Sequence, residues 1–156
     1  MRFTRYTDYA FRVLMYLGLK EDGALVTIKE IAKRYGISEN HLTKVVHQLG
    51  QNGFVTTVRG RQGGIRLARD PAAINVGDVV RRCEEDLRLV ECFDPKTNTC
   101  AIAGACGIPP ILDEALAAFF TVLDGYSLAD LLVPRAGLAA ALGSGAGADD
   151  LGARAG

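Results

Sequence analysis

The sequence predicts a mainly α-helical fold with one small β-hairpin, and three observations support that prediction. Apolar residues recur at three- and four-residue intervals over several stretches, which is typical of amphipathic helices. Two short β-branched runs flank a Gly-rich turn, the pattern of a hairpin. The chain has 156 residues, of which 49% are hydrophobic, so a single domain can bury a core without disulfides or a structural metal.

The first two helices are predicted from an apolar stripe and from a capping pattern. The stripe covers residues 3–17, and a break at Gly23 follows it. A second helix is expected to begin after Thr27, whose hydroxyl can cap the first turn, while Glu30 can reach back to complete a capping box. Gly36 is expected to end this helix. The stripe of the first helix consists of Phe3, Tyr6, Ala10, Val13, Leu14 and Leu17.

The middle of the chain predicts a third helix, the hairpin and a short fourth helix. Ser38 stands where it can cap the third helix. Residues 54–58 and 65–67 are expected to form the two strands, joined by the Gly-rich turn. Asn75 can cap the fourth helix, which is expected to end near Cys83. The apolar face of the third helix consists of Leu42, Val45, Val46 and Leu49.

The C-terminal part predicts one long helix and then a tail. Pro109 and Pro110 suit the first turn of a helix that is expected to end near Gly125, and Ser127 can cap a final short turn. In residues 133–156, 14 of 24 residues are Gly or Ala and none is aromatic, so we expect a disordered tail. The apolar stripe of the long helix consists of Ile111, Leu112, Ala115, Ala118, Phe119, Val122 and Leu123.

The charge of the chain is distributed very unevenly. Residues 1–82 carry 14 Lys and Arg against 7 Asp and Glu, whereas residues 83–156 carry 4 against 11. A basic half is expected to meet a polyanion. No apolar run approaches the roughly 20 residues of a membrane span, and the N-terminus leads into an amphipathic pattern rather than a signal-peptide core. We therefore expect a cytoplasmic protein that does not enter a membrane.

The segment from the second helix through the hairpin predicts a winged helix-turn-helix that binds double-stranded DNA. Ala32 allows a close approach of the two helices, and Gly36 forms the turn between them. The second of these helices would enter the major groove, and the basic hairpin would contact phosphates as a wing. The alternative is an ordinary solvated surface, which the combination of features disfavours. The candidate DNA contacts are Ser38, Asn40, His41, Thr43, Lys44, Arg59, Arg61, Gln62 and Arg66.

Three cysteines on an irregular stretch form a second candidate site. Cys92, Cys100 and Cys106 have the spacing C-x7-C-x5-C, which is looser than that of zinc ribbons. Three soft thiolates without a fourth suit an iron–sulfur cluster in which another residue type holds the remaining iron. The alternative is a redox-switch disulfide between two of them, in a DNA-binding protein without a cluster. Cys83 lies on an apolar helical face and is expected in the core.

Over residues 1 to about 132 the chain resembles the Rrf-type winged-helix iron–sulfur transcriptional regulators. The resemblance rests on Thr7-Asp8-Tyr9-Ala10, on Val58-Arg59-Gly60 with Gly63-Gly64-Ile65-Arg66-Leu67, and on Ile74-Asn75-Val76-Gly77-Asp78-Val79-Val80. Three further segments are similar to the nitric-oxide-sensing repressors of this family. They are Leu89-Val90-Glu91-Cys92, Cys100-Ala101-Ile102-Ala103-Gly104-Ala105-Cys106, and Leu123-Asp124-Gly125-Tyr126-Ser127-Leu128-Ala129-Asp130-Leu131.

The resemblance implies a homodimer joined by the long C-terminal dimerisation helix, with one cluster per subunit. The cluster is expected to be [4Fe-4S], with [2Fe-2S] as the alternative. The implied function is repression at a pseudo-palindromic operator, with release of the DNA when nitric oxide attacks the cluster. A regulator of cluster supply or redox state is the alternative within the family. In the branch of the family that senses cluster supply, a His stands three residues after the last cysteine. This chain has Pro109 at that position, which counts against the cluster-supply alternative.

The resemblance also implies the fourth cluster ligand and the organisation of the chain. The implied ligand is Asp8, contributed by the partner subunit, whereas the local alternative is that Asp8 caps the first helix or pairs with Arg5 or Arg12. The expected parts are a DNA-binding region over 1–82, a cluster-binding loop over 83–107, a dimerisation helix with its final turn over 108–132, and the disordered tail over 133–156.

Two rivals from other classes are weaker. An enzyme with a cysteine nucleophile would need a His and an acid beside it, but both His41 and His47 lie on the expected recognition helix, so no catalytic residues are expected. A plain DNA-packaging dimer with inert cysteines is the second rival. The colour of anaerobically purified protein would separate that rival from an iron–sulfur protein.

Overall fold

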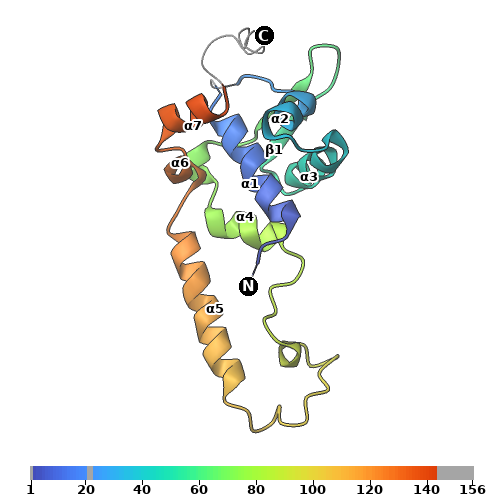
Figure 1. The fold of residues 1–156 in the computed structure, drawn as a ribbon, viewed down its shortest axis with the longest axis vertical. Helices are drawn as coiled ribbons and strands as arrows, with labels where there is room; N and C mark the ends of the chain where they lie inside the picture. The colour runs from blue at the N-terminus through green and yellow to red at the C-terminus, as the bar shows by residue number, and fades with distance from the viewer. Residues whose placement is uncertain (1, 21–22, 144–156) are drawn as a thin grey trace, which may run out of the picture.

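The computed structural model describes residues 2–20 and 23–143, and it shows a helical body from which one long helix and one irregular loop extend (Figure 1). The expected class, mainly α with a two-stranded hairpin, is confirmed. In chain order the elements are α1 (Arg5–Gly18), α2 (Ile28–Tyr35), α3 (Glu39–Gln51), β1 (Val55–Val58), β2 (Gly64–Leu67), η1 (Pro71–Ala73), α4 (Val76–Cys83), η2 (Glu91–Phe93), α5 (Ile108–Asp124), α6 (Leu128–Leu131) and α7 (Arg135–Ala141).

Helix α1 is the centre of the body. It contacts α3, α4, α6 and β2, and Figure 1 shows it surrounded by these elements. Thr4 caps its first turn by accepting a hydrogen bond from the backbone N–H of Thr7. The contacts bury most of the apolar stripe predicted from the sequence, but Phe3 lies before the helix and is 38% exposed, and Tyr6 is only half-buried. The buried residues of the stripe are Ala10, Val13, Leu14 and Leu17, with Tyr16 and Thr7 beside them.

The helix-turn-helix forms as predicted, with two changes in its capping. The Thr27 hydroxyl caps α2, and Gly36 ends it with a φ of 64°, a left-handed conformation that glycine adopts without strain. Glu30 does not complete the expected capping box, because its carboxylate instead accepts hydrogen bonds from the Tyr16 hydroxyl and the Lys20 ammonium. Ser38 occupies the cap position of α3, but its side chain makes no capping hydrogen bond.

The wing is an antiparallel hairpin in which Thr56 stands opposite Arg66 and Val58 opposite Gly64. The backbone of Val26 pairs with that of Ile65 through two hydrogen bonds, so the segment before α2 extends the small sheet by one bridge. Ile65 is buried, which attaches the base of the wing to the core that α1 organises. The tip between the strands remains outside the core.

The C-terminal end of helix α5 is attached to the body, and from there the helix projects so that its N-terminal end lies far from the body (Figure 1). Of its 17 residues only Phe120 is buried, and on the predicted apolar stripe Ile111 is 66% exposed and Val122 is 61% exposed. The same chain therefore leaves much of this apolar stripe uncovered, although Leu112, Phe119 and Leu123 are half-buried. Among the described residues, no helix combines the length and the apolar character needed to cross a membrane.

The expectation of a disordered tail from residue 133 is wrong for the residues that form α7. The Arg135 guanidinium donates hydrogen bonds to the carbonyl oxygens of Gly18 and Leu19 at the end of α1. Leu138 and Leu142, one helical turn apart, pack against the core. The Gly- and Ala-rich composition did not reveal these contacts. The side chains of Arg135, Leu138 and Leu142 are enough to hold a short Ala-rich helix against the body. Residues 144–156 of the expected tail lie outside the described residues.

Arg135→Ala is expected to lower the free energy of unfolding by about 1 kcal/mol, since two carbonyl groups at the end of α1 lose their charged donor. Urea unfolding followed by circular dichroism measures the change. Arg61→Ala is the matched control, because Arg61 is exposed on the wing turn and its replacement should leave stability unchanged. Equal midpoints for both variants would show that α7 does not stabilise α1.

Candidate DNA interface and cysteine loop

The polar face of α3 is presented to solvent. Leu42, Val45, Val46 and Leu49 are buried against the body, which turns the opposite face of the helix outward. Ser38, Asn40, His41, Thr43 and Lys44 are all exposed on that outward face or at its start. The Thr43 hydroxyl donates to the carbonyl oxygen of Glu39, so toward a base edge it can offer only its oxygen lone pairs and its methyl group.

The wing carries the remaining predicted DNA contacts. Arg59, Arg61 and Gln62 lie in the turn between β1 and β2, and Arg66 lies on β2, all of them exposed. Within the part of the chain that the structure describes, none of these arginines forms an ion pair with an acidic side chain. Their positive charge is therefore available to phosphates. The structure thus gathers all nine predicted residues on exposed parts of one winged helix-turn-helix.

The cysteine loop runs from the end of α4 to the start of α5 and contains η2. All four cysteines of the chain are free thiols. Cys92 and Cys106 are half-buried and Cys100 is exposed, so the loop thiols are accessible. Cys83 is only 3% exposed, as predicted, and its burial raises the pKa of its thiol to about 12. It sits beside Tyr6, whose pKa is also raised, mainly by burial.

Polar side chains organise the first half of the loop. Arg88 pairs with both Asp86 and Asp94, and its hydrogen bonds lower the pKa of Asp86 to about 2. The Glu91 carboxylate accepts hydrogen bonds from the backbone N–H and the hydroxyl of Thr99, at 3.1 and 3.2 Å. Glu91 directly precedes Cys92, and Thr99 directly precedes Cys100. Their contact therefore links the two segments of the loop that carry these cysteines. Sequence reasoning did not single out these residues.

The structure does not bring the predicted cluster ligands together. Among the residues it describes, no group of three or more His, Cys, Asp or Glu side chains is arranged to hold a metal ion. Asp8 lies in the first turn of α1 and pairs with Arg12 at 2.9 Å, which is the local contact named as the alternative. The donor set nevertheless suits an iron–sulfur cluster, because three accessible soft thiols on an irregular loop can be drawn together by the metal that they bind.

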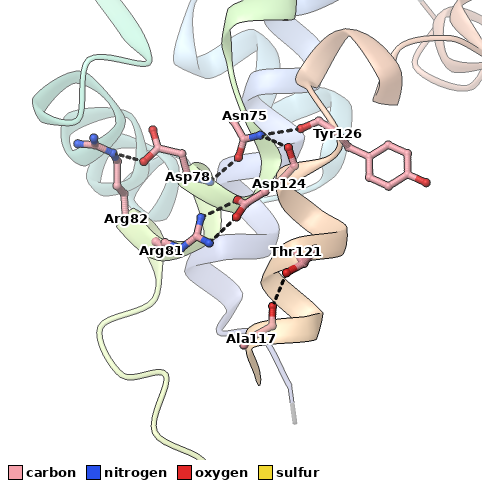
Figure 2. Close-up of polar contacts among 8 residues, drawn as sticks. All are labelled: Asn75, Asp78, Arg81, Arg82, Ala117, Thr121, Asp124 and Tyr126. Carbon is pink, nitrogen blue, oxygen red and sulfur yellow. Dashed lines mark hydrogen bonds and ion pairs between the residues drawn. The ribbon is translucent and has the colours of Figure 1, made fainter. Parts of the chain in front are cut away.

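A polar junction between α4 and α5 was also missed by sequence reasoning. Arg81 on α4 forms an ion pair with Asp124 at the end of α5, and Asn75 donates to the carbonyl oxygens of Asp124 and Tyr126 (Figure 2). Asn75 was expected only to cap α4, which it also does by accepting from the Asp78 N–H. The one sequence signal that could have indicated this close approach is Gly77, an isolated glycine within α4 that lies beside Asp124.

Comparison with known proteins identifies relatives that are transcriptional regulators. The Rrf2 family, described as iron-dependent transcriptional regulators, matches residues 3–134. The HTH-type transcriptional regulator NsrR of Bacillus subtilis (strain 168) is 53% identical over 132 residues, which cover 85% of this chain and 90% of that protein. NsrR of Geobacillus kaustophilus (strain HTA426) is 51% identical over 138 residues, covering 88% and 94% respectively.

Solved structures of related regulators share the fold. CymR, the global cysteine regulator of B. subtilis, superposes with a TM-score of 0.66 at 25% identity, covering 84% of this chain and 95% of that chain. IscR of T. potens superposes with a TM-score of 0.65 at 29% identity, covering 85% and 86% respectively. The winged helix-turn-helix and the long helix are therefore an arrangement known among transcriptional regulators.

In metal-free protein at pH 8, an alkylating reagent is expected to modify Cys92, Cys100 and Cys106 rapidly and Cys83 slowly. The pKa of Cys83 near 12 leaves little of its reactive thiolate at this pH, and burial also blocks access. Mass spectrometry over time counts the modified thiols. Cys83→Ala should remove only the slow phase, and rapid modification of Cys83 in folded protein would contradict its placement in the core.

Proposed function

The chain belongs to the Rrf2 family of iron-dependent transcriptional regulators, and on that premise we propose that it is a homodimeric repressor. In this proposal its cysteine loop holds an iron–sulfur cluster. The protein releases its operator when nitric oxide attacks that cluster. The observation that carries the proposal is the identity of about half of its residues to NsrR regulators across most of the chain. Because its ligand is chromosomal DNA, we propose that it acts in the cytoplasm.

The DNA-binding part of the proposal rests on α3 and the wing. In a dimer, two copies of α3 would enter successive major grooves on one side of the duplex, so the operator would be pseudo-palindromic, with half-sites about 10 base pairs apart or a multiple of that. The uncovered stripe on α5, with Ile111 and Val122 largely exposed, supports pairing with the same helix of a second copy. Burying this stripe against its equivalent would remove apolar surface from water.

The proposed cluster site consists of Cys92, Cys100 and Cys106 of one subunit and Asp8 of the other, with [4Fe-4S] favoured over [2Fe-2S]. When bound, the cluster supplies iron with which nitric oxide can react. Because a carboxylate is a harder and weaker iron ligand than a thiolate, an iron held by Asp8 would be the one that nitric oxide reaches first. Its side chain is 50% exposed, so exchanging the Arg12 pair for another partner needs little desolvation.

Ligation by the partner's Asp8 would couple the cluster to DNA binding. Asp8 lies on α1, the helix that packs on α3 and on α4. A ligand from α1 of one subunit would therefore tie the cysteine loop of the other subunit to a recognition helix. Loss of the cluster would release that tie, which is the difference between two states that an effector needs in order to change DNA affinity.

Anaerobically purified protein is expected to be coloured, and Cys92→Ala, Cys100→Ala and Cys106→Ala are each expected to lose the cluster absorbance, because each removes a thiolate ligand. Cys83→Ala, the matched control, should keep it. Visible absorbance with iron and sulfide counting measures loading, and operator affinity should fall about tenfold or more on addition of nitric oxide. Full colour in any loop variant would remove that cysteine from the ligand set.

For the fourth ligand, Asp8→Ala is compared with Arg12→Ala. Both variants lose the ion pair within α1, but only Asp8→Ala loses the carboxylate. We expect Asp8→Ala alone to change the spectrum of the cluster and its rate of reaction with nitric oxide. Equal behaviour of the two variants in both measurements would show that Asp8 is not a ligand.

Arg59→Ala and Arg61→Ala are expected to weaken DNA binding and to flatten its salt dependence, by about 0.9 in the slope of log K against log salt for each phosphate that the variant no longer neutralises. Fluorescence anisotropy at several salt concentrations gives the slope. Lys96→Ala, which removes an exposed cation outside the proposed interface, should leave the slope unchanged. An unchanged slope in both arginine variants would mean that the wing does not contact phosphates.

A further inference from the structure

The body of the chain is joined to α5 at a small and highly connected junction, shown in Figure 2. The backbone on either side pairs directly: the Val76 N–H donates to the Tyr126 carbonyl at 2.9 Å, and the Leu128 N–H donates to the Ile74 carbonyl at 2.8 Å. These bonds fix the point at which α5 leaves the body. They do not fix the direction of the helix from that point, because both lie beyond its last residue.

Arg81 and Asp124 supply a constraint on that direction. The two terminal nitrogens of Arg81 each donate to one carboxylate oxygen of Asp124, both at 2.7 Å. This two-point contact matches the planar guanidinium to the planar carboxylate, so it restricts orientation as well as distance. The same guanidinium lies 4.2 Å from the centre of the Phe120 ring, one turn earlier on α5. One side chain of α4 thus contacts α5 at two successive turns.

Gly77 makes this close contact sterically feasible. A methyl group at residue 77 would overlap with carboxylate oxygen Oδ1 of Asp124 and approach the Arg81 guanidinium. Gly77 lies in helix α4, where alanine is intrinsically more favourable than glycine. Gly77→Ala would therefore displace Asp124 without weakening α4 itself. The substitution offers a way to disturb the junction that removes neither charge.

We propose that Arg81 and Asp124 are positioning residues that set the direction of α5 relative to α3 and thereby determine which spacing of operator half-sites the dimer accepts. This inference rests on the proposed function, in which α5 joins two subunits and α3 reads DNA. Helix α5 is a lever of 17 residues, or about 25 Å. A tilt of about 8° would move its far end by about 3.4 Å, the rise of one base pair.

The neighbouring Arg82–Asp78 pair provides a matched control. It is also an Arg–Asp ion pair at 2.7 Å with a similar exposure, although it consists of one hydrogen bond, from Arg82 Nε to Asp78 Oδ1, rather than two. Both of its residues lie on α4, so the pair does not reach α5 (Figure 2). Loss of either pair removes one partly exposed ion pair. Only loss of the Arg81–Asp124 pair removes a constraint between the two helices.

The test measures affinity for three duplexes. One is a duplex selected by the wild-type protein from a random pool, and the others have one base pair inserted or deleted at its centre. The wild type is expected to discriminate between them by about tenfold or more. Asp124→Ala and Gly77→Ala should reduce this ratio by about fivefold or more, while Asp78→Ala leaves it unchanged. The charge exchange Arg81→Asp with Asp124→Arg should restore a substantial part of the discrimination.

Thermal unfolding of each variant separates a positioning role from a loss of fold. Wild-type discrimination in folded Asp124→Ala and Gly77→Ala would overturn the inference, as would an equal loss in Asp78→Ala. If Asp124→Ala does not fold, Gly77→Ala and the charge exchange decide the question by the same ratio. If the wild type selects no sequence from the pool, the proposed function itself fails, and the inference fails with it.

Discussion

The burial of one face of α1 is the constraint on which the rest of the structure depends. Recognition helix, wing, α4 and α6 all pack on this helix, and its C-terminal end is capped by Arg135 from α7. None of these elements can shift far without disturbing a close-packed core, which tolerates little change in volume. A displacement of α1 would consequently shift α3, which packs on it. A cluster ligand on α1 would therefore be well placed to affect DNA binding.

Two segments contrast with this core because the chain itself does not cover them. The stripe of α5 is apolar yet exposed, and the loop thiols are soft donors with no metal ligand set around them among the residues that the structure describes. Neither arrangement is explained by the stability of a single chain, since exposed apolar surface and free thiols contribute nothing to it. The proposed function supplies a partner for each: a second copy of the chain would cover α5, and an iron–sulfur cluster would bind the loop thiols.

The sequence was sufficient where the signal is local and insufficient where it depends on distant segments. Helix periodicity and the caps at Thr27, Asn75 and Ser127 were predicted because each involves residues within one turn. The exposure of the candidate DNA contacts followed from the same periodicity, although their contact with DNA stays a prediction. The Arg81–Asp124 pair spans 43 positions, and its existence depends on how two helices approach, which periodicity does not encode.

In the proposed dimer, the junction of α4 and α5 also bears on how a change in the cysteine loop would reach the DNA-binding part. The loop is attached to the C-terminal end of α4 and to the N-terminal end of α5, and its first residue, Glu84, accepts a hydrogen bond from the Thr4 N–H at the start of α1. In the proposed cluster-bound dimer, gathering the thiols around a metal would act on the three helices to which the loop is connected, α1, α4 and α5. Because Arg81 holds α4 and α5 in a defined relation, this rearrangement would move them as one unit and change the spacing between two recognition helices rather than dissipate in a flexible hinge.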